Sequence, residues 1–439
     1  MTCRGTLAAW MIACLTAGLS GHVLAQSALP LKGTVDEDAT AAGPAVLRPE
    51  TSLEVSPLEP PDRPRLRRAG AAADPYAPTG IGTGGLRLYP SITAGAVYSS
   101  NVNSSPSHPK SDIGWQLKPT LKLESDWVRH ALTVGLDGNL VRYSGSPRFD
   151  TSNLNVSERL RLDVRRHTTA EINSGYILDE PGGDDPTEHS LTGTAALTHD
   201  FGPMSARISA GTTTRLYDDL RRSNGSVEDN GDRDYVETSL GLRTTYNEYG
   251  TIRPYVEASL APRTHLRELD RHGINRDSTG YALTSGLELD AGPIWAGDLG
   301  LTYLHRSYDS ASLGSAGAFG LTGNVTWSPN DLTKVVMTAG TALDETTQAD
   351  MPATATWTAG VGMTYGLRDN IDLLAGAAIK IEDTGRGVDT TYDGSIGVAW
   401  KLNPMMAWTA GYDLTWFDAG TTGGDYVEHR LRTGVTLSR

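Results

Sequence analysis

Apolar and polar residues alternate along the chain from Leu86 onwards, in segments of about 10 to 14 residues. Between Ile113 and Leu123, for example, every second residue is apolar, and the residues between them are glycine, glutamine, lysine or threonine. A period of two is typical of a β-strand whose two faces meet different surroundings. Eighteen such segments follow one another up to the C-terminus. We therefore predict an all-β domain over residues 86–439.

The connections between these segments are alternately short and long. The short ones fall at 125–129, 165–167, 201–204, 247–250, 290–293, 328–331, 366–370 and 401–404. The long, polar ones include 100–111, 179–187, 218–233 and 267–277. In an up-and-down antiparallel sheet, alternate connections lie at opposite ends. One end of the predicted sheet therefore carries tight turns, and the other carries extended loops.

This pattern predicts a transmembrane up-and-down antiparallel β-barrel of about 18 strands, as found in outer membranes. Lipid offers backbone groups no hydrogen-bond partner, so a sheet can cross a bilayer only when it closes on itself and leaves no free edge. In such barrels the short turns face the periplasm and the long loops face outwards. An even number of strands places both ends of the barrel on the periplasmic side.

The polar face of the predicted sheet is densely charged, which distinguishes it from the solvent face of a soluble sandwich. An arginine facing the middle of the bilayer would cost about 2 to 4 kcal/mol, so this sorting indicates a wet lumen. We expect the constriction of that lumen among Arg159, Arg161, Arg207, Arg215, Arg243, Arg253 and Glu257. Glu158 breaks the pattern, because it shares its register with apolar residues such as Val156 and Leu160. A bulge, a shallow position or an error in the assigned register would each explain it.

Tryptophans occur near the ends of several segments, as at Trp115, Trp295, Trp327, Trp400 and Trp416. Aromatic side chains at both ends of the strands are typical of the girdles with which outer-membrane barrels meet the two lipid interfaces. Ordinary packing on a sheet surface is the alternative interpretation.

The first 85 residues differ from the rest of the chain. Residues 1–25 combine Arg4 with an apolar stretch and end in Val-Leu-Ala, which predicts a secretory signal peptide cut before Gln26. A lipoprotein signal with Cys14 as the lipidated residue is the alternative. Residues 26–85 hold 9 of the 23 prolines and have no apolar period, which predicts a disordered periplasmic tail. Its arginines between Arg63 and Arg68 form either a solvated patch or a contact for anionic lipid or a partner.

Composition and motifs exclude several kinds of activity. The net charge of −14 argues against a nucleic-acid-binding protein, and both cysteines lie within the predicted signal peptide. The histidines show no metal-ligand spacing, and His199–Asp200 is best explained as the end of a strand. Two acidic loops, 179–185 and 229–234, could hold a divalent ion weakly, although solvated loops explain them better. We expect no enzyme activity and no cofactor.

Residues at the start of the domain resemble a known family. The similarity rests on Gly95-x-x-Tyr98-x-x-Asn101-Val102-Asn103, Ser111-Asp112, Pro119 and Leu123-Glu124-Ser125-Asp126-Trp127-x-x-His130. This combination resembles the putative beta-barrel porin family of proteobacterial outer membranes, which is often found alongside exopolysaccharide biosynthesis genes. The resemblance is best over residues 86 to about 220. It implies an outer-membrane pore connected with surface polysaccharide and no catalytic residues.

The sequence thus predicts an exported protein of the Gram-negative outer membrane that works as a porin-like channel for polysaccharide or other hydrophilic solutes. A plugged, non-conducting surface barrel that acts as an adhesin or docks polysaccharide would share these features, and an outer-membrane hydrolase is a third candidate. The expected partners are outer-membrane lipid, lipopolysaccharide, the barrel-assembly machinery and surface polysaccharide, with no nucleic acid.

Overall fold

The computed structural model describes residues 75–439, apart from 184, 222–224, 248–249, 347, 349–350, 386 and 421–423. The predicted signal peptide and most of the predicted tail lie outside these residues. Among the described residues, no helix is both long and apolar enough to cross a bilayer.

Nearly all of the described chain forms β-strands. The elements are β1 (Ile81–Thr83), β2 (Leu86–Ser99), β3 (Asp112–Ser125), β4 (Ala131–Tyr143), η3 (Pro147–Phe149), β5 (Thr151–Arg165), β6 (Thr168–Glu180), β7 (Glu188–Asp200), β8 (Met204–Tyr217), β9 (Leu220–Arg221), β10 (Val227–Glu228), β11 (Tyr235–Tyr246), β12 (Ile252–His265), β13 (Ser278–Asp290), β14 (Trp295–Tyr308), β15 (Ser315–Asn330), β16 (Thr333–Asp344), β17 (Thr354–Arg368), β18 (Ile371–Asp383), β19 (Val388–Asn403), β20 (Met406–Asp418) and β21 (Tyr426–Ser438). The short strands β9 and β10 pair with each other inside the loop that joins β8 to β11.

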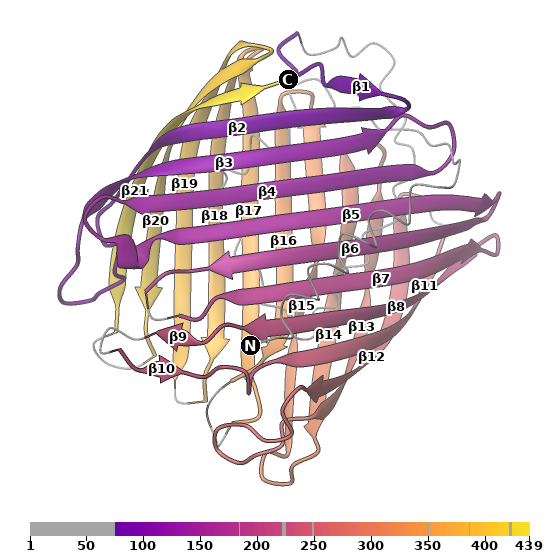
Figure 1. Cartoon of the computed structure of the whole chain (residues 1–439). Helices are drawn as coiled ribbons and strands as arrows, with labels where there is room; N and C mark the ends of the chain where they lie inside the picture. The colour runs from indigo at the N-terminus through magenta and orange to yellow at the C-terminus, as the bar shows by residue number, and fades with distance from the viewer. Residues whose placement is uncertain are drawn as a thin grey trace.

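The long strands form one closed barrel (Figure 1). Each strand pairs antiparallel with the next, β8 pairs with β11, and β2 closes the ring by pairing with β21. The closing ladder runs from Ser91, opposite Ser438, to Ser99, opposite Arg430. The prediction of an 18-stranded antiparallel barrel is confirmed, and no open edge remains where the first and last strands meet.

The two ends of the barrel differ as the sequence predicted. Eight short connections, within about three residues of the predicted places, lie at one end, which we call the short-turn end, and nine connections, most of them longer, lie at the other, the long-loop end. Both described chain ends lie at the short-turn end, where the Arg439 amide donates to the Pro90 carbonyl. Residues 81–83, which the sequence assigned to the tail, instead pair with the start of β2 as β1.

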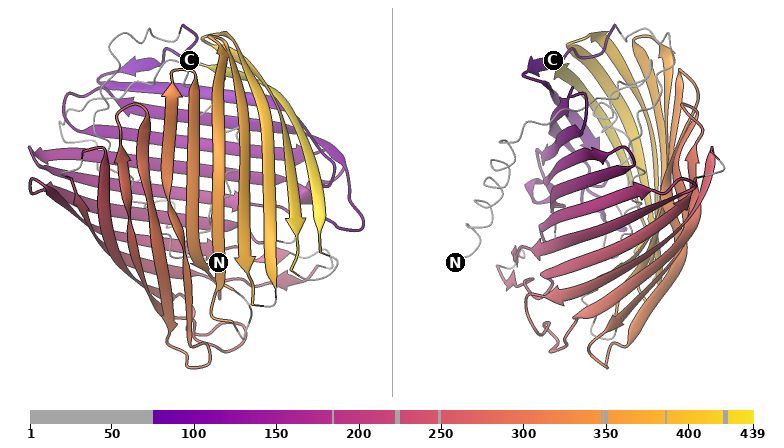
Figure 2. Two further views of the ribbon diagram at one scale, coloured as in Figure 1. Left: turned by 180° about the vertical axis from the view of Figure 1, so that it is seen from behind. Right: turned by 90° about the vertical axis from the view of Figure 1, so that its right-hand side faces the viewer.

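The two faces of the wall separate by chemistry. Large apolar side chains point outwards, and Ile208, Leu301 and Phe319 are each more than 60% exposed. Aromatic residues gather near both ends of this outer face, where Trp295 stacks on Trp327 and Trp416 stacks on Tyr392. Their positions fit lipid interfaces better than ordinary sheet packing. Figure 2 shows the same closed wall from behind and from the side.

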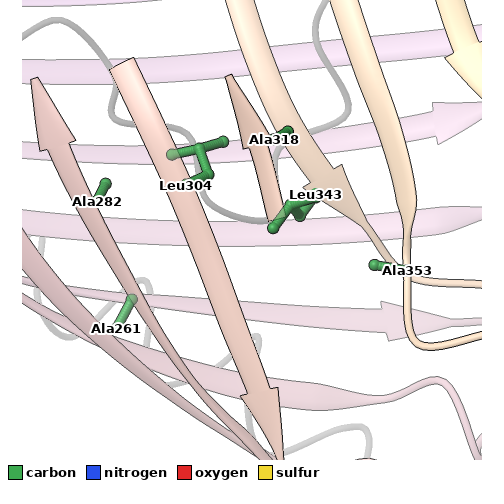
Figure 3. Packing of buried hydrophobic residues seen from close by; sticks show 6 residues of the cluster. All are labelled: Ala261, Ala282, Leu304, Ala318, Leu343 and Ala353. Atoms are coloured by element: carbon green, nitrogen blue, oxygen red, sulfur yellow. The ribbon is translucent and has the colours of Figure 1, made fainter. Parts of the chain in front are cut away.

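The wall is less regular between β15 and β16. Their continuous ladder stops at the pair Gly323–Ala339 and does not extend to the long-loop end. There Leu343 of β16 packs with the inward-facing Leu304 and Ala318 of the neighbouring strands, in an apolar cluster inside the barrel (Figure 3). We call this junction the β15–β16 seam. Beyond the last pair, β16 also contacts β14, and β17 also contacts β15.

Glu158 faces outwards in an unbroken part of the wall. It stands opposite Val134 on β4 and Ser174 on β6, and the β5 irregularity falls later, between Asp163 and Arg165. The Ser174 hydroxyl donates to the Glu158 carboxylate at 3.0 Å. The register assigned from the sequence was therefore right, and no bulge accounts for this residue.

Candidate functional site: the charged lumen and its short-turn vestibule

All seven residues that the sequence proposed as pore-lining lie on the inward register, but they do not form one ring. Arg207, Arg243 and Glu257 occupy a single row across β8, β11 and β12. Arg253 lies nearer the short-turn end of β12. Arg215 lies near the opposite end of the lumen, where it pairs with Glu188 at 2.8 Å. The proposed set therefore extends along the lumen and does not encircle it at one level.

Arg207 and Arg243 stand directly opposite each other, which is unfavourable for two like charges on neighbouring strands. Carboxylates on both sides compensate for this arrangement. Arg207 donates to Glu171 at 2.6 Å, and Arg243 contacts Asp298 at 3.1 Å and Glu288 at 3.3 Å. The Arg243 guanidinium also lies 3.6 Å from the centre of the Tyr255 ring, a favourable cation–π position.

These groups belong to a charged network that covers the inner wall from β6, which carries Glu171, to β14. Arg253 extends it by bridging Glu288 at 2.8 Å and Asp290 at 2.6 Å. Arg207, Arg243 and Glu257 are buried despite facing the lumen, because the long side chains lie along the wall and cover one another. Buried charges of this kind need partners, and the carboxylates of the network supply them.

A second network lies on the same wall near the long-loop end. Arg263 and Arg306 have no exposed surface, and both donate to Glu237, at 2.8 Å and 2.5 Å. Glu345, which follows β16, also pairs with Arg263 and so draws the start of the β16–β17 loop into the barrel. The sequence pattern indicates only part of this cluster. It places Arg263 and Glu237 on the inward register, but nothing in the sequence indicates that Glu345 reaches them.

Arg161, Arg207 and Arg243 line a cavity of about 360 Å³ at the short-turn end of the lumen, which we call the vestibule. Its walls are Arg129, Arg161, Asp163, Arg165, Arg166, Thr169, Thr198, Asp200, Ser205, Arg207, Arg243, Thr245, Asn247 and Glu288. The set holds six arginines and three acidic residues. The pore-lining residues expected from the sequence do not include Arg129, Arg165 and Arg166, because the short turns were interpreted only as connections, although the Arg165–Arg166 pair was a visible signal.

Arginines from the loop between β12 and β13 form ion pairs with the acidic loop 229–234. Arg271 contacts Asp232 at 2.8 Å and Glu228 at 2.6 Å, and Arg267 contacts Asp229 at 2.9 Å. Burial alone would raise the pKa of Asp232, but the hydrogen bonds and charge of Arg271 outweigh it and lower that pKa to about 2. Among the described residues no group of three His, Cys, Asp or Glu side chains that could hold a metal ion occurs.

The closed barrel, its apolar outer face and its charged lumen define a porin-like barrel of the outer membrane. The family described as Putative beta-barrel porin 2 matches residues 74–439, and the chain belongs to this family. The resemblance seen in the first strands is thereby confirmed.

Solved structures with a similar architecture are distant in sequence. They include the outer membrane protein OpdK of Pseudomonas aeruginosa (10% identity, TM-score 0.41, covering 80% of this chain and 99% of that one). OccK2 of the same organism has 9% identity and a TM-score of 0.42, with 80% and 98% covered. The siderophore receptor PirA, also from Pseudomonas aeruginosa, has 9% identity and a TM-score of 0.39, with 80% of each chain covered. No curated protein sequence matches the chain.

Proposed function

We propose that this protein is a channel through which hydrophilic solutes cross the outer membrane, and that it has no catalytic activity. The observation that carries the proposal is the densely charged inner face of a closed 18-stranded wall, with an accessible vestibule at one end. Barrels of 16 to 18 strands are wide enough to leave an aqueous passage when no loop fills them. The short-turn end then faces the periplasm, and the long loops face outwards.

Polysaccharide is the finer candidate for the solute. Its support is the family resemblance described above, together with a lumen in which basic and acidic groups are close to balanced, as suits hydrated solutes. In this proposal the barrel reaches the membrane through a signal peptide and the barrel-assembly machinery. Its long loops lie among lipopolysaccharide head groups.

A plugged, non-conducting barrel that docks surface polysaccharide is the second candidate, and one observation favours it. Arg263 and Arg306 are completely buried on the lumen side, and Glu345 brings the β16–β17 loop against them. That arrangement places Glu345 inside the long-loop end of the lumen. Conductance decides between the two functions, because docking requires no open path.

The test is to insert the purified barrel into planar bilayers and into liposomes loaded with an osmolyte. The channel proposal expects discrete conductance steps, and liposomes that swell in small sugars at rates that fall as sugar size increases. Protein that has been boiled before reconstitution is the control and should give neither signal. A barrel that is folded by electrophoretic mobility yet neither conducts nor admits sugars would overturn the proposal and favour docking.

A further inference from the structure

We propose that the vestibule is a binding site for an oxyanion, namely a carboxylate or phosphate group carried by the hydrophilic solute that enters from the short-turn end. This inference rests on the proposed channel function for its direction of entry. The binding itself requires only the cavity and its side chains. It assigns the chemical class of the solute, which the balanced charge of the whole lumen leaves open.

The vestibule is built by separate parts of the barrel that converge at one end. Arg129 comes from the turn after β3, Arg165 and Arg166 come from the end of β5 and its turn, and the inner faces of β6 to β8 supply the floor. Its volume of about 360 Å³ is near the lower end of the range for ligand pockets. One acidic unit of a longer solute fits such a space, and the rest of the solute can extend along the lumen.

The charges of the vestibule do not cancel. Six arginines face three acidic residues, an excess of three positive charges. The deep arginines are already compensated: Arg161 by Asp163 at 3.0 Å, Arg243 by Glu288 at 3.3 Å, and Arg207 by Glu171, which lies outside the lining. The remaining positive charge lies at the rim, where Arg129, Arg165 and Arg166 outnumber the one other lining carboxylate, Asp200.

The rim arginines are exposed, and among the described residues no carboxylate lies within ion-pair distance of them. Arg129 is nevertheless held in place, because its guanidinium donates to the Asp163 backbone carbonyl at 2.9 Å. Arg207 adds a buried Nε without a hydrogen-bond partner at the cavity wall.

Guanidinium groups in this arrangement suit carboxylate and phosphate in particular. Each presents a planar fork of donors that binds two oxygens at once, and such charge-assisted pairs are about twice as strong as neutral hydrogen bonds. A concave wall with a net positive charge also concentrates anions at its mouth. A neutral sugar gains neither effect, so the vestibule should discriminate by charge between solutes of equal size.

The experiment measures equilibrium binding to the folded barrel in detergent at low salt, by calorimetry. The probes are trigalacturonate for carboxylate, glucose 6-phosphate for phosphate and maltotriose as the neutral sugar. The test variant is Arg165→Gln/Arg166→Gln. The matched control is Arg87→Gln/Arg368→Gln, which removes the same charge from exposed arginines at the short-turn ends of β2 and β17, outside the cavity.

We expect an acidic probe to bind at least about tenfold more tightly than maltotriose, and the test variant to lose roughly tenfold in affinity. The affinity of the control variant should stay within about twofold of that of the wild type. Whichever acidic probe binds shows whether the site takes a carboxylate or a phosphate. Equal affinity for acidic and neutral probes, or a test variant as strong as the control, would overturn the site. Binding without conductance would support the oxyanion site and overturn the proposed channel function. Conductance without binding would support the channel function and overturn the oxyanion site.

Discussion

Glu158 carries a carboxylate at the centre of β5, on the face that the barrel turns towards lipid. Its neighbours on that face include Val156, Leu160 and Ile172, and Ser174 provides its hydrogen bond. Charged side chains at this depth destabilise outer-membrane barrels, with carboxylates costing less than the 2 to 4 kcal/mol typical of arginine and lysine. The residue therefore opposes the stability of the wall unless it serves a contact outside the chain.

Replacing Glu158 tests whether its carboxylate destabilises the wall or serves a contact outside the chain. Glu158→Leu should raise the free energy of unfolding by about 1 to 2 kcal/mol, since it exchanges a lipid-facing charge for an apolar side chain. Urea unfolding of the barrel in lipid vesicles, followed by tryptophan fluorescence, measures the change. Ser174→Ala is the control for the lost hydrogen bond and should change stability by less than about 1 kcal/mol. A destabilised Glu158→Leu barrel would show instead that the carboxylate has a partner in the membrane.

The inward direction of the lumen residues could be predicted from the sequence, but their contacts could not. The period of two assigns Arg243 to the wet face, because Leu240 and Leu242 both occupy the opposite register. The partners of Arg243 come from three other strands, and Asp298 is 55 positions away. Which carboxylate an arginine reaches depends on strand stagger and side-chain length, and neither is encoded in a local pattern.

At the level of the strands, the β15–β16 seam is the junction that the sequence pattern did not reveal. Side chains replace the missing ladder: the Thr341 hydroxyl donates to the Leu321 carbonyl at 2.9 Å, and the Trp357 indole donates to the Phe319 carbonyl at 2.8 Å. Gly320 lies so close to Thr341 that a Cβ atom would overlap it. The alternating pattern continues through both strands, so it could predict their existence and their faces but not where their pairing stops.

The seam should open more readily than the rest of the wall, because side-chain hydrogen bonds hold it where a ladder holds the other junctions. In hydrogen–deuterium exchange on the folded barrel, residues 315–322 and 340–344 should exchange faster than β13. The ladder between β13 and β14 runs unbroken from Ser278 to Asp290, so β13 is an internal reference. Equal protection of the seam and the reference would mean that β15 and β16 pair fully in the membrane.

Turn and loop positions were the most predictable elements, for a physical reason. Most of the short turns contain glycine, proline or asparagine, as in Asp290-Ala291-Gly292-Pro293, and such groups interrupt the alternation visibly. The start of the barrel was less predictable. The short strand β1 is flanked by glycines and has too few residues to show a period, so sequence assigned it to the tail.

For the molecule as a whole, the wall and the long loops depend on different interactions and should respond differently to acid. The wall is closed by backbone ladders that carry no titratable group. Arg271, in the loop between β12 and β13, contacts Asp232 and Glu228 in the loop between β8 and β11 and so joins these two long loops. Because the folded pKa of Asp232, about 2, lies below its ordinary value near 4, this carboxylate stabilises the loops fully above about pH 4. That contribution is lost as the pH falls through about 2.

Acid should therefore release the long loops while the barrel stays closed. Pepsin, which works in acid, should cut the loops next to β11 and β12 slowly at pH 4 and rapidly at pH 2. The unboiled barrel should still migrate differently from the boiled one in electrophoresis after both treatments. Arg271→Gln should make these loops sensitive already at pH 4, because Asp232 then loses the charge that lowers its pKa, whereas Arg368→Gln at the short-turn end should not. Loss of the unboiled mobility at pH 2 would show that wall and loops unfold together, contrary to a barrel that closes on itself through its backbone.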